Sequence, residues 1–157
     1  MAAPGPVNIP IEVLLIEDSP ADVRLMEEAF RDVNKSVRLH FASDGVEAMT
    51  FLKGDGKLSA PHVDLILLDL NLPKLDGREV LAQIKADPSL RTIPVIILTM
   101  SDAEADVIRC CQLQANCYLH KPANWEMFYR LVKSINDFWL TQVTFLQRSQ
   151  EAYGARY

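Results

Sequence analysis

The sequence has no long apolar run, no cluster of basic residues and no paired cysteines, and each absence removes a class of protein. No apolar stretch approaches the roughly 20 residues that a helix needs to cross a bilayer. The formal net charge is −5, with 16 Lys and Arg against 21 Asp and Glu, whereas a nucleic-acid-binding surface needs clustered cations. We therefore expect neither a membrane nor a nucleic acid as a partner.

Cysteine and histidine form no disulfide or metal-binding pattern. There are three cysteines, an odd number, and they lack CxxC spacing: Cys110, Cys111 and Cys117. We therefore expect reduced thiols in a cytoplasmic protein. The three histidines show no metal-ligand spacing either. The first ten residues contain three prolines and no basic segment before an apolar core, unlike a secretory signal. Residues 1–9 are expected to be a flexible N-terminal tail.

Short apolar runs alternate with helical patterns along the chain. Residues 13–16, 65–68, 95–98 and 117–120 are such runs, and 37–41 is a weaker one. Short, continuous apolar runs between helices are typical of parallel strands that are buried on both faces. The alternation predicts an α/β fold, a doubly wound five-stranded parallel sheet with helices on both faces.

Polar residues mark the expected ends of the helices. Ser19 and Asn124 are expected to cap the first and the last helix. Ser101 or Asp102 is expected to cap the fourth helix. Asn116 is expected to adopt a left-handed turn conformation before the last strand.

Chemically functional side chains follow four of the apolar runs. Glu17 and Asp18 follow the first, Asp69 follows the run at 65–68, Thr99 closes the next, and Lys121 follows the last. Because parallel strands present their carboxyl ends at one edge of a sheet, these groups should meet there. Three acids, a hydroxyl and an ammonium group suit a small divalent cation and a phosphoryl group.

The chemistry of this set is that of phosphoryl transfer. Mg²⁺ prefers oxygen ligands and needs only one or two carboxylates, and crowded acids repel one another unless a cation lies among them. Asp69 could attack phosphorus as a nucleophile. The metal and Lys121 would neutralise charge on the phosphoryl oxygens. The Thr99 hydroxyl could bind a phosphoryl oxygen once the phosphate is present.

Together these motifs resemble those of two-component response-regulator receiver domains. The resemblance covers about residues 11–138 and is carried by Glu17-Asp18-Ser19, the segment 68–73, Asp76-Gly77, Leu98-Thr99 and the segment 118–122. It implies the flavodoxin-like strand order 2-1-3-4-5. One departure is visible, because Gln114 stands where the family often has glycine.

The resemblance also assigns roles to individual residues. It implies that Asp69 is the phosphoacceptor and that Lys121 contacts the phosphoryl group. It implies that Thr99 is a hydroxyl switch and Tyr118 a rotameric aromatic switch. The implied cofactor is Mg²⁺, held by Asp18, Asp69 and the backbone carbonyl of Asn71, with Glu17 helping through water. A cis peptide bond between Lys121 and Pro122 is implied as well.

An apolar stripe continues beyond the expected sheet, within a last helix that is therefore extended. It includes Phe138, Trp139, Val143 and Phe145, and large exposed apolar groups mark interaction surfaces. Self-association is the preferred interpretation, and folding back onto the same domain is the alternative. We expect a receiver domain at 10–143, an extension at 144–157, and no output domain after it.

A narrower resemblance, at 115–121, 123–124 and 136–140, is to the small response regulators that partner cyanobacterial phytochrome histidine kinases. It implies a homodimer through the fourth helix, fifth strand and fifth helix, and a kinase that docks near the first helix.

Two other functions stay open. One is a phosphatase with Asp69 as covalent nucleophile, although Asn71 stands where haloacid-dehalogenase-type enzymes normally carry a second Asp. The other is a scaffold that binds without phosphorylation.

Overall fold

The computed structural model describes residues 9–54 and 61–142. Five parallel strands form one sheet in the order β2-β1-β3-β4-β5, as the receiver resemblance implied. The strands are β1 (Ile11–Ile16), β2 (Val37–Ala42), β3 (Leu65–Leu68), β4 (Val95–Thr99) and β5 (Cys117–His120). Residues 1–8 of the tail expected at 1–9, and the whole extension expected at 144–157, lie outside the described residues.

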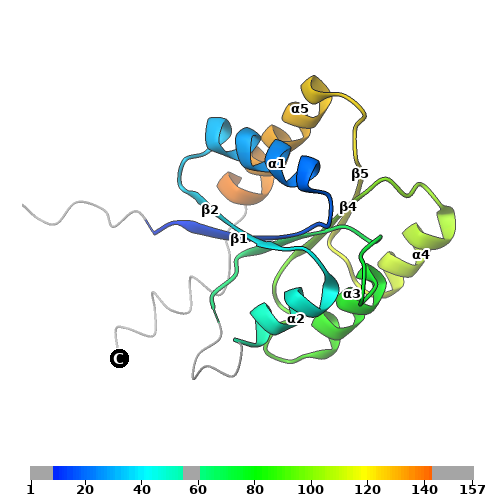
Figure 1. Cartoon of the computed structure of the whole chain (residues 1–157). Coiled ribbons are helices and arrows are strands. Elements are labelled where there is room, and N and C mark those ends of the chain that lie inside the picture. The colour runs from blue at the N-terminus through cyan, green and yellow to red at the C-terminus, as the bar shows by residue number, and fades with distance from the viewer. Residues whose placement is uncertain (1–8, 55–60, 143–157) are drawn as a thin grey trace, which may run out of the picture.

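Helices cover both faces of the sheet (Figure 1). They are α1 (Pro20–Val33), α2 (Gly45–Lys53), α3 (Gly77–Ala86), α4 (Glu104–Gln112) and α5 (Trp125–Ile135). Figure 1 shows α1 and α5 on one face and α2, α3 and α4 on the other. None of the helices within the described ranges is long and apolar enough to span a membrane.

The strand side chains alternate between two apolar layers because successive side chains of a strand point to opposite faces. Leu15 and Leu67 pack with Met26 and Phe30 of α1 in one layer. In the other, Leu14, Ile16, Ile66 and Leu68 pack against residues of α2 and α3 (Ala48, Leu52, Val80, Leu81 and Ile84). Burial on both faces explains why β1, β3 and β4 read as continuous apolar runs.

The expected caps of the first and last helices are confirmed. Ser19 Oγ accepts a hydrogen bond from the backbone N–H of Asp22 at 3.3 Å. Asn124 Oδ1 accepts from the N–H of Met127 at 3.0 Å.

Two local expectations near α4 were wrong. The helix begins at Glu104, so Ala103, which has no side-chain acceptor, occupies the N-cap position of α4. The Ser101 hydroxyl donates instead to Asp106 of the first turn. The left-handed residue before β5, within the described range 61–142, is Gln114 (φ 65°) rather than Asn116. The Asn116 side chain instead accepts a hydrogen bond from the N–H of Val95.

The chain after α5 continues as a π-helix, η1 (Asn136–Gln142). Trp139 and Leu140 pack against the apolar layer beneath α1 and α5, so this part of the apolar stripe folds back onto its own domain. Phe138 remains 55% exposed and meets the Trp139 ring edge-on, with ring centroids 5.5 Å apart. Val143 and Phe145, named with them as interface candidates, lie outside the described residues.

Candidate functional site

The sheet brings the four predicted strand-end groups together at its carboxyl edge. Backbone hydrogen bonds join the two pairs of strand ends: the N–H of Asp69 donates to Ile16 O at 3.0 Å, and the N–H of Lys121 donates to Thr99 O at 2.8 Å. Glu17, Asp69, Thr99 and Lys121 are all buried there. Asp18 also lies at the site and is exposed.

Lys121 is the centre of an ionic cluster. Its Nζ donates to Asp69 Oδ2 at 3.0 Å, to Asp22 Oδ2 at 2.8 Å, and to Glu17 Oε2. The three donors of an ammonium group are thus matched by three carboxylates. This arrangement keeps the acids paired inside the fold, where an isolated charge is costly.

Asp69 is held on both of its oxygens. Oδ2 accepts from Lys121, while Oδ1 accepts from Thr99 Oγ1 at 2.8 Å and from the N–H of Asn71 at 3.2 Å. The Thr99 hydroxyl was expected to bind a phosphoryl oxygen once phosphate is present. In this structure it contacts the carboxylate itself.

The two buried carboxyls of the cluster have pKa values shifted in opposite directions. Burial tends to raise the pKa of Asp69, but the hydrogen bonds and charge of Lys121, with the Thr99 hydrogen bond, outweigh it and lower that pKa. Burial raises the pKa of Glu17 to about 7, although Lys121 acts to lower it. Asp69 is therefore held as the carboxylate at neutral pH, the form that can act as a nucleophile.

The acidic cluster fits a divalent cation. Glu17, Asp18 and Asp69 each offer a carboxylate oxygen, and these atoms lie within 4.8 Å of one another. Hard oxygen ligands at this density suit Mg²⁺. Asp18, as the exposed member, lies on the solvent side, where a metal that keeps several waters would enter.

Asp22 also belongs to the site, although it was not among the predicted site residues. It is five residues beyond Glu17, in the first turn of the helix that follows β1, and its carboxylate reaches Lys121. The signal was available, because the first turn of a helix after a strand lies at the same edge as the strand end.

Tyr118, the expected aromatic switch, does not touch Asp69. It is half-buried on β5, packs against the layer beneath α3 and α4, and its hydroxyl donates to Ser101 O at 2.7 Å. Its link to the site therefore passes through the loop that follows Thr99.

The Lys121–Pro122 peptide bond is trans, so the expected cis bond was wrong. A trans bond is favoured before proline by about 0.5–1 kcal/mol. Lys121 reaches its three carboxylate partners with this geometry.

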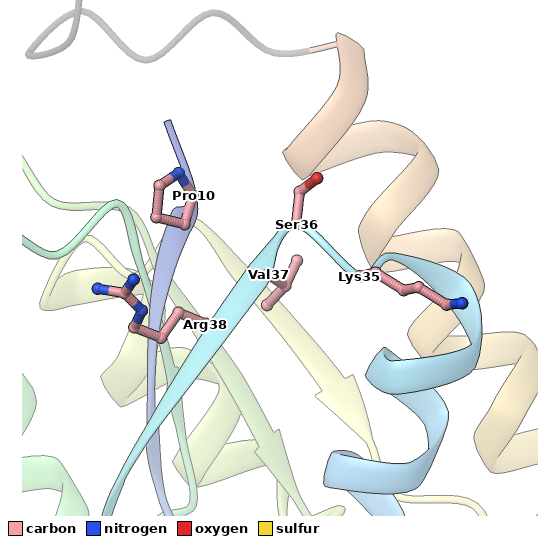
Figure 2. A pocket seen from close by; sticks show the side chains of 5 residues that line it. All are labelled: Pro10, Lys35, Ser36, Val37 and Arg38. Carbon is pink, nitrogen blue, oxygen red and sulfur yellow. The ribbon is translucent and has the colours of Figure 1, made fainter. Parts of the chain in front are cut away.

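A surface hollow lies away from this cluster, beside the N-terminal ends of β1 and β2. It has a volume of about 510 Å³ and is lined by Pro10, Lys35, Ser36, Val37 and Arg38. Figure 2 shows the side chains of Lys35 and Arg38 pointing away from each other. Their charges do not converge on a common ligand position.

A buried acid held between a lysine and a hydroxyl, at the carboxyl edge of a 2-1-3-4-5 sheet, defines the receiver class of signalling domain. The chain belongs to the response regulator receiver domain family, which it matches over residues 13–133.

Among characterised proteins, the chain is 48% identical over 138 residues to the response regulator Rcp1 of Synechocystis sp., which covers 87% of this chain and 94% of that protein. The crystal structure of the phosphorylated cyanobacterial phytochrome response regulator RcpA matches with a TM-score of 0.82 and 45% identity, over 86% of this chain and 97% of that one. The Mn²⁺-bound form of Rcp1 matches with a TM-score of 0.81 and 47% identity, over 87% and 99%. These similarities confirm the relationship to cyanobacterial phytochrome response regulators.

Proposed function

We propose that this chain is a phosphorylation-switched response regulator in which Asp69 accepts a phosphoryl group from a histidine kinase in a Mg²⁺-dependent reaction. The observation that carries the proposal is the Asp69 carboxylate, buried and held between Lys121 Nζ and Thr99 Oγ1. A carboxylate held in this way is oriented for attack and faces the groups that would receive the charge of the phosphoryl oxygens.

In the proposed reaction an oxygen of Asp69 bonds to phosphorus while the bond from phosphorus to the kinase histidine nitrogen breaks. The electron pair of that bond stays on the nitrogen. Lys121 exchanges part of its carboxylate pairing for the phosphoryl oxygens, and Thr99 turns its hydroxyl to one of them. Mg²⁺, with Asp18, Asp69 and the Asn71 carbonyl as ligands and Glu17 acting through water, would neutralise the remaining oxygen charge.

Asp69→Asn should abolish phosphorylation, because an amide oxygen at this position is a poor nucleophile. Radiolabelled acetyl phosphate with Mg²⁺ measures the reaction without a kinase, and labelling should fall to background. Asp32→Asn is the matched control, since Asp32 is exposed on α1, and it should label like the unaltered protein. Labelling of the Asp69→Asn variant at the control rate would overturn the proposal.

The proposed donor is a phytochrome-type histidine kinase. Its support is similarity alone, since the related structure RcpA is described as a cyanobacterial phytochrome response regulator.

The phosphatase alternative has less support. The Asn71 amide, two residues after Asp69, has no proton of suitable acidity to act as the general acid that such enzymes place there.

We also propose that the chain forms a homodimer through α4, β5, α5 and the segment that follows. Apolar side chains are exposed on α4, where Val107 is 40% and Ile108 48% exposed, and on η1, where Phe138 is 55% exposed. Removing such surface from water favours association by roughly 25 cal/mol for each Å² of apolar area. Because Trp139 and Leu140 pack onto their own domain, the exposed Phe138 side chain is available to contact a second copy.

Phe138→Ser and Ile108→Ser should each shift the protein toward the monomer in sedimentation equilibrium, with and without Mg²⁺ and beryllofluoride. Val46→Ser is the matched control, because Val46 is 51% exposed on α2, outside the proposed interface. An unchanged association constant in both interface variants would contradict the proposed surface. An association constant that is the same with and without beryllofluoride would show that the dimer forms independently of phosphorylation.

A further inference from the structure

A chain of polar contacts leads from the β4–α4 loop to α3. The Ser101 hydroxyl donates to Asp106 Oδ2 at 2.5 Å. The other oxygen of that carboxylate, Oδ1, accepts from Arg78 Nε and also contacts Arg78 Nη2, each at 2.7 Å. Arg78 Nη1 in turn bonds both oxygens of Asp76, at 3.1 and 3.0 Å. One arginine at the start of α3 is thus fixed by two carboxylates, one of which holds Ser101.

Ser101 is also the residue to which both proposed switch residues connect. Its N–H donates to Thr99 Oγ1 at 3.4 Å. The same Thr99 hydroxyl donates its own hydrogen to Asp69 Oδ1. The Ser101 carbonyl accepts the Tyr118 hydroxyl at 2.7 Å. Ser101 therefore contacts both the Thr99 hydroxyl oxygen and the Tyr118 hydroxyl through its backbone.

The Asp106 contacts are placed to hold this loop. Ala103 occupies the N-cap of α4 without a side-chain acceptor, and Asp106, in the first turn, joins that turn to the loop and to α3. The Arg78 and Asp106 side chains are 28% and 17% exposed, so their pairing is partly shielded from water. Hydrogen bonds between charged groups are stronger than those between neutral groups, and shielding preserves them.

We propose that Arg78 and Asp106 are positioning residues for the phosphoacceptor site, acting through Ser101 to keep the Thr99 hydroxyl directed at Asp69 and the Tyr118 hydroxyl bound to the loop. The inference rests on the proposed role of Asp69. It adds that the α3–α4 side of the domain sets the affinity for the phosphoryl group, although neither Arg78 nor Asp106 contacts Asp69.

The test is the affinity for beryllofluoride with Mg²⁺, a stable mimic of the phosphoryl group, measured by ¹⁹F NMR or calorimetry on folded protein. Arg78→Met and Ser101→Ala should each weaken binding by about three- to tenfold, the size of one lost hydrogen bond. Arg78→Lys should restore part of the affinity, because the ammonium group can still reach Asp106. Arg31→Met is the matched control, since the Arg31 ion pair with Glu27 on α1 is long and exposed, and it should bind like the unaltered protein.

The double variant separates positioning from general stability. If Arg78 acts through the Ser101 hydroxyl, Arg78→Met should cause little further loss in the Ser101→Ala protein. Additive losses, or an Arg78→Met affinity equal to that of the Arg31→Met control, would overturn the inference while leaving Asp69 as acceptor. If the unaltered protein itself fails to bind beryllofluoride, the proposed function falls, and this inference falls with it.

Discussion

Lys121→Met is expected to lower the free energy of unfolding by about 3–5 kcal/mol when Mg²⁺ is removed with EDTA, because breaking a buried ion pair leaves the opposite charge uncompensated. The ammonium group bonds three carboxylates, those of Glu17, Asp22 and Asp69. Without it, these acids would face one another in a buried site with no cation. Urea unfolding at neutral pH measures the loss.

Two conditions should reduce this loss. Mg²⁺ should restore part of the stability, because a divalent cation at Glu17, Asp18 and Asp69 replaces the missing positive charge. Acidic pH should also reduce the stability lost in Lys121→Met. Burial already raises the pKa of Glu17 to about 7, and loss of Lys121 removes the neighbour that lowers it. Below that pH Glu17 carries a proton, so there is less repulsion among the three acids when Lys121 is absent.

Lys74→Met is the matched control for the loss of one lysine. The Lys74 side chain is 68% exposed, and its Nζ lies 3.2 Å from Asp44 Oδ2. Exposed pairs of this kind contribute at most about 1 kcal/mol. Equal stability of the two variants without Mg²⁺ would show that the acids are not held by Lys121.

The strand ends were predictable from the sequence because burial on both faces leaves a simple pattern. In a sheet covered on both sides a strand is a short apolar run, and the residue that follows it must lie at the edge. Two of these residues, Asp69 and Lys121, lie 52 positions apart in the chain, yet their side chains meet at 3.0 Å. Their meeting follows from the topology.

Contacts that depend on side-chain reach could not be predicted in this way. Arg78 and Asp106 are separated by 28 positions and come from helices, and nothing in either segment specifies which rotamer bridges them. The same holds for Ser101, whose hydroxyl could cap α4 or bond Asp106. The left-handed turn was assigned to Asn116 on residue preference. The chain places it at Gln114, and the Asn116 side chain instead accepts a hydrogen bond from the start of β4.

Gly77→Ala is expected to lower the free energy of unfolding by about 3 kcal/mol, at the upper end for overpacking, and to weaken beryllofluoride binding. A Cβ on Gly77 would lie 2.3 Å from the carbonyl oxygen of Asp69 and 2.6 Å from Leu70 Cα. Both are backbone atoms, and the hydrogen bond from Gly77 N to Leu70 O, at 2.9 Å, keeps α3 against this segment. The methyl group can be accommodated only if α3 or the Asp69 backbone moves.

Gly54→Ala separates lost stability from a displaced site. Gly54 ends α2 with a φ of 82°, so alanine there should cost about 1 kcal/mol through backbone strain, with beryllofluoride affinity unchanged. In Gly77→Ala, affinity should fall even at temperatures where the protein is fully folded, because Asp69 moves relative to Lys121 and Thr99. A Gly77→Ala protein that is less stable but binds beryllofluoride as tightly as the Gly54→Ala protein would show that α3 shifts and the Asp69 backbone stays fixed.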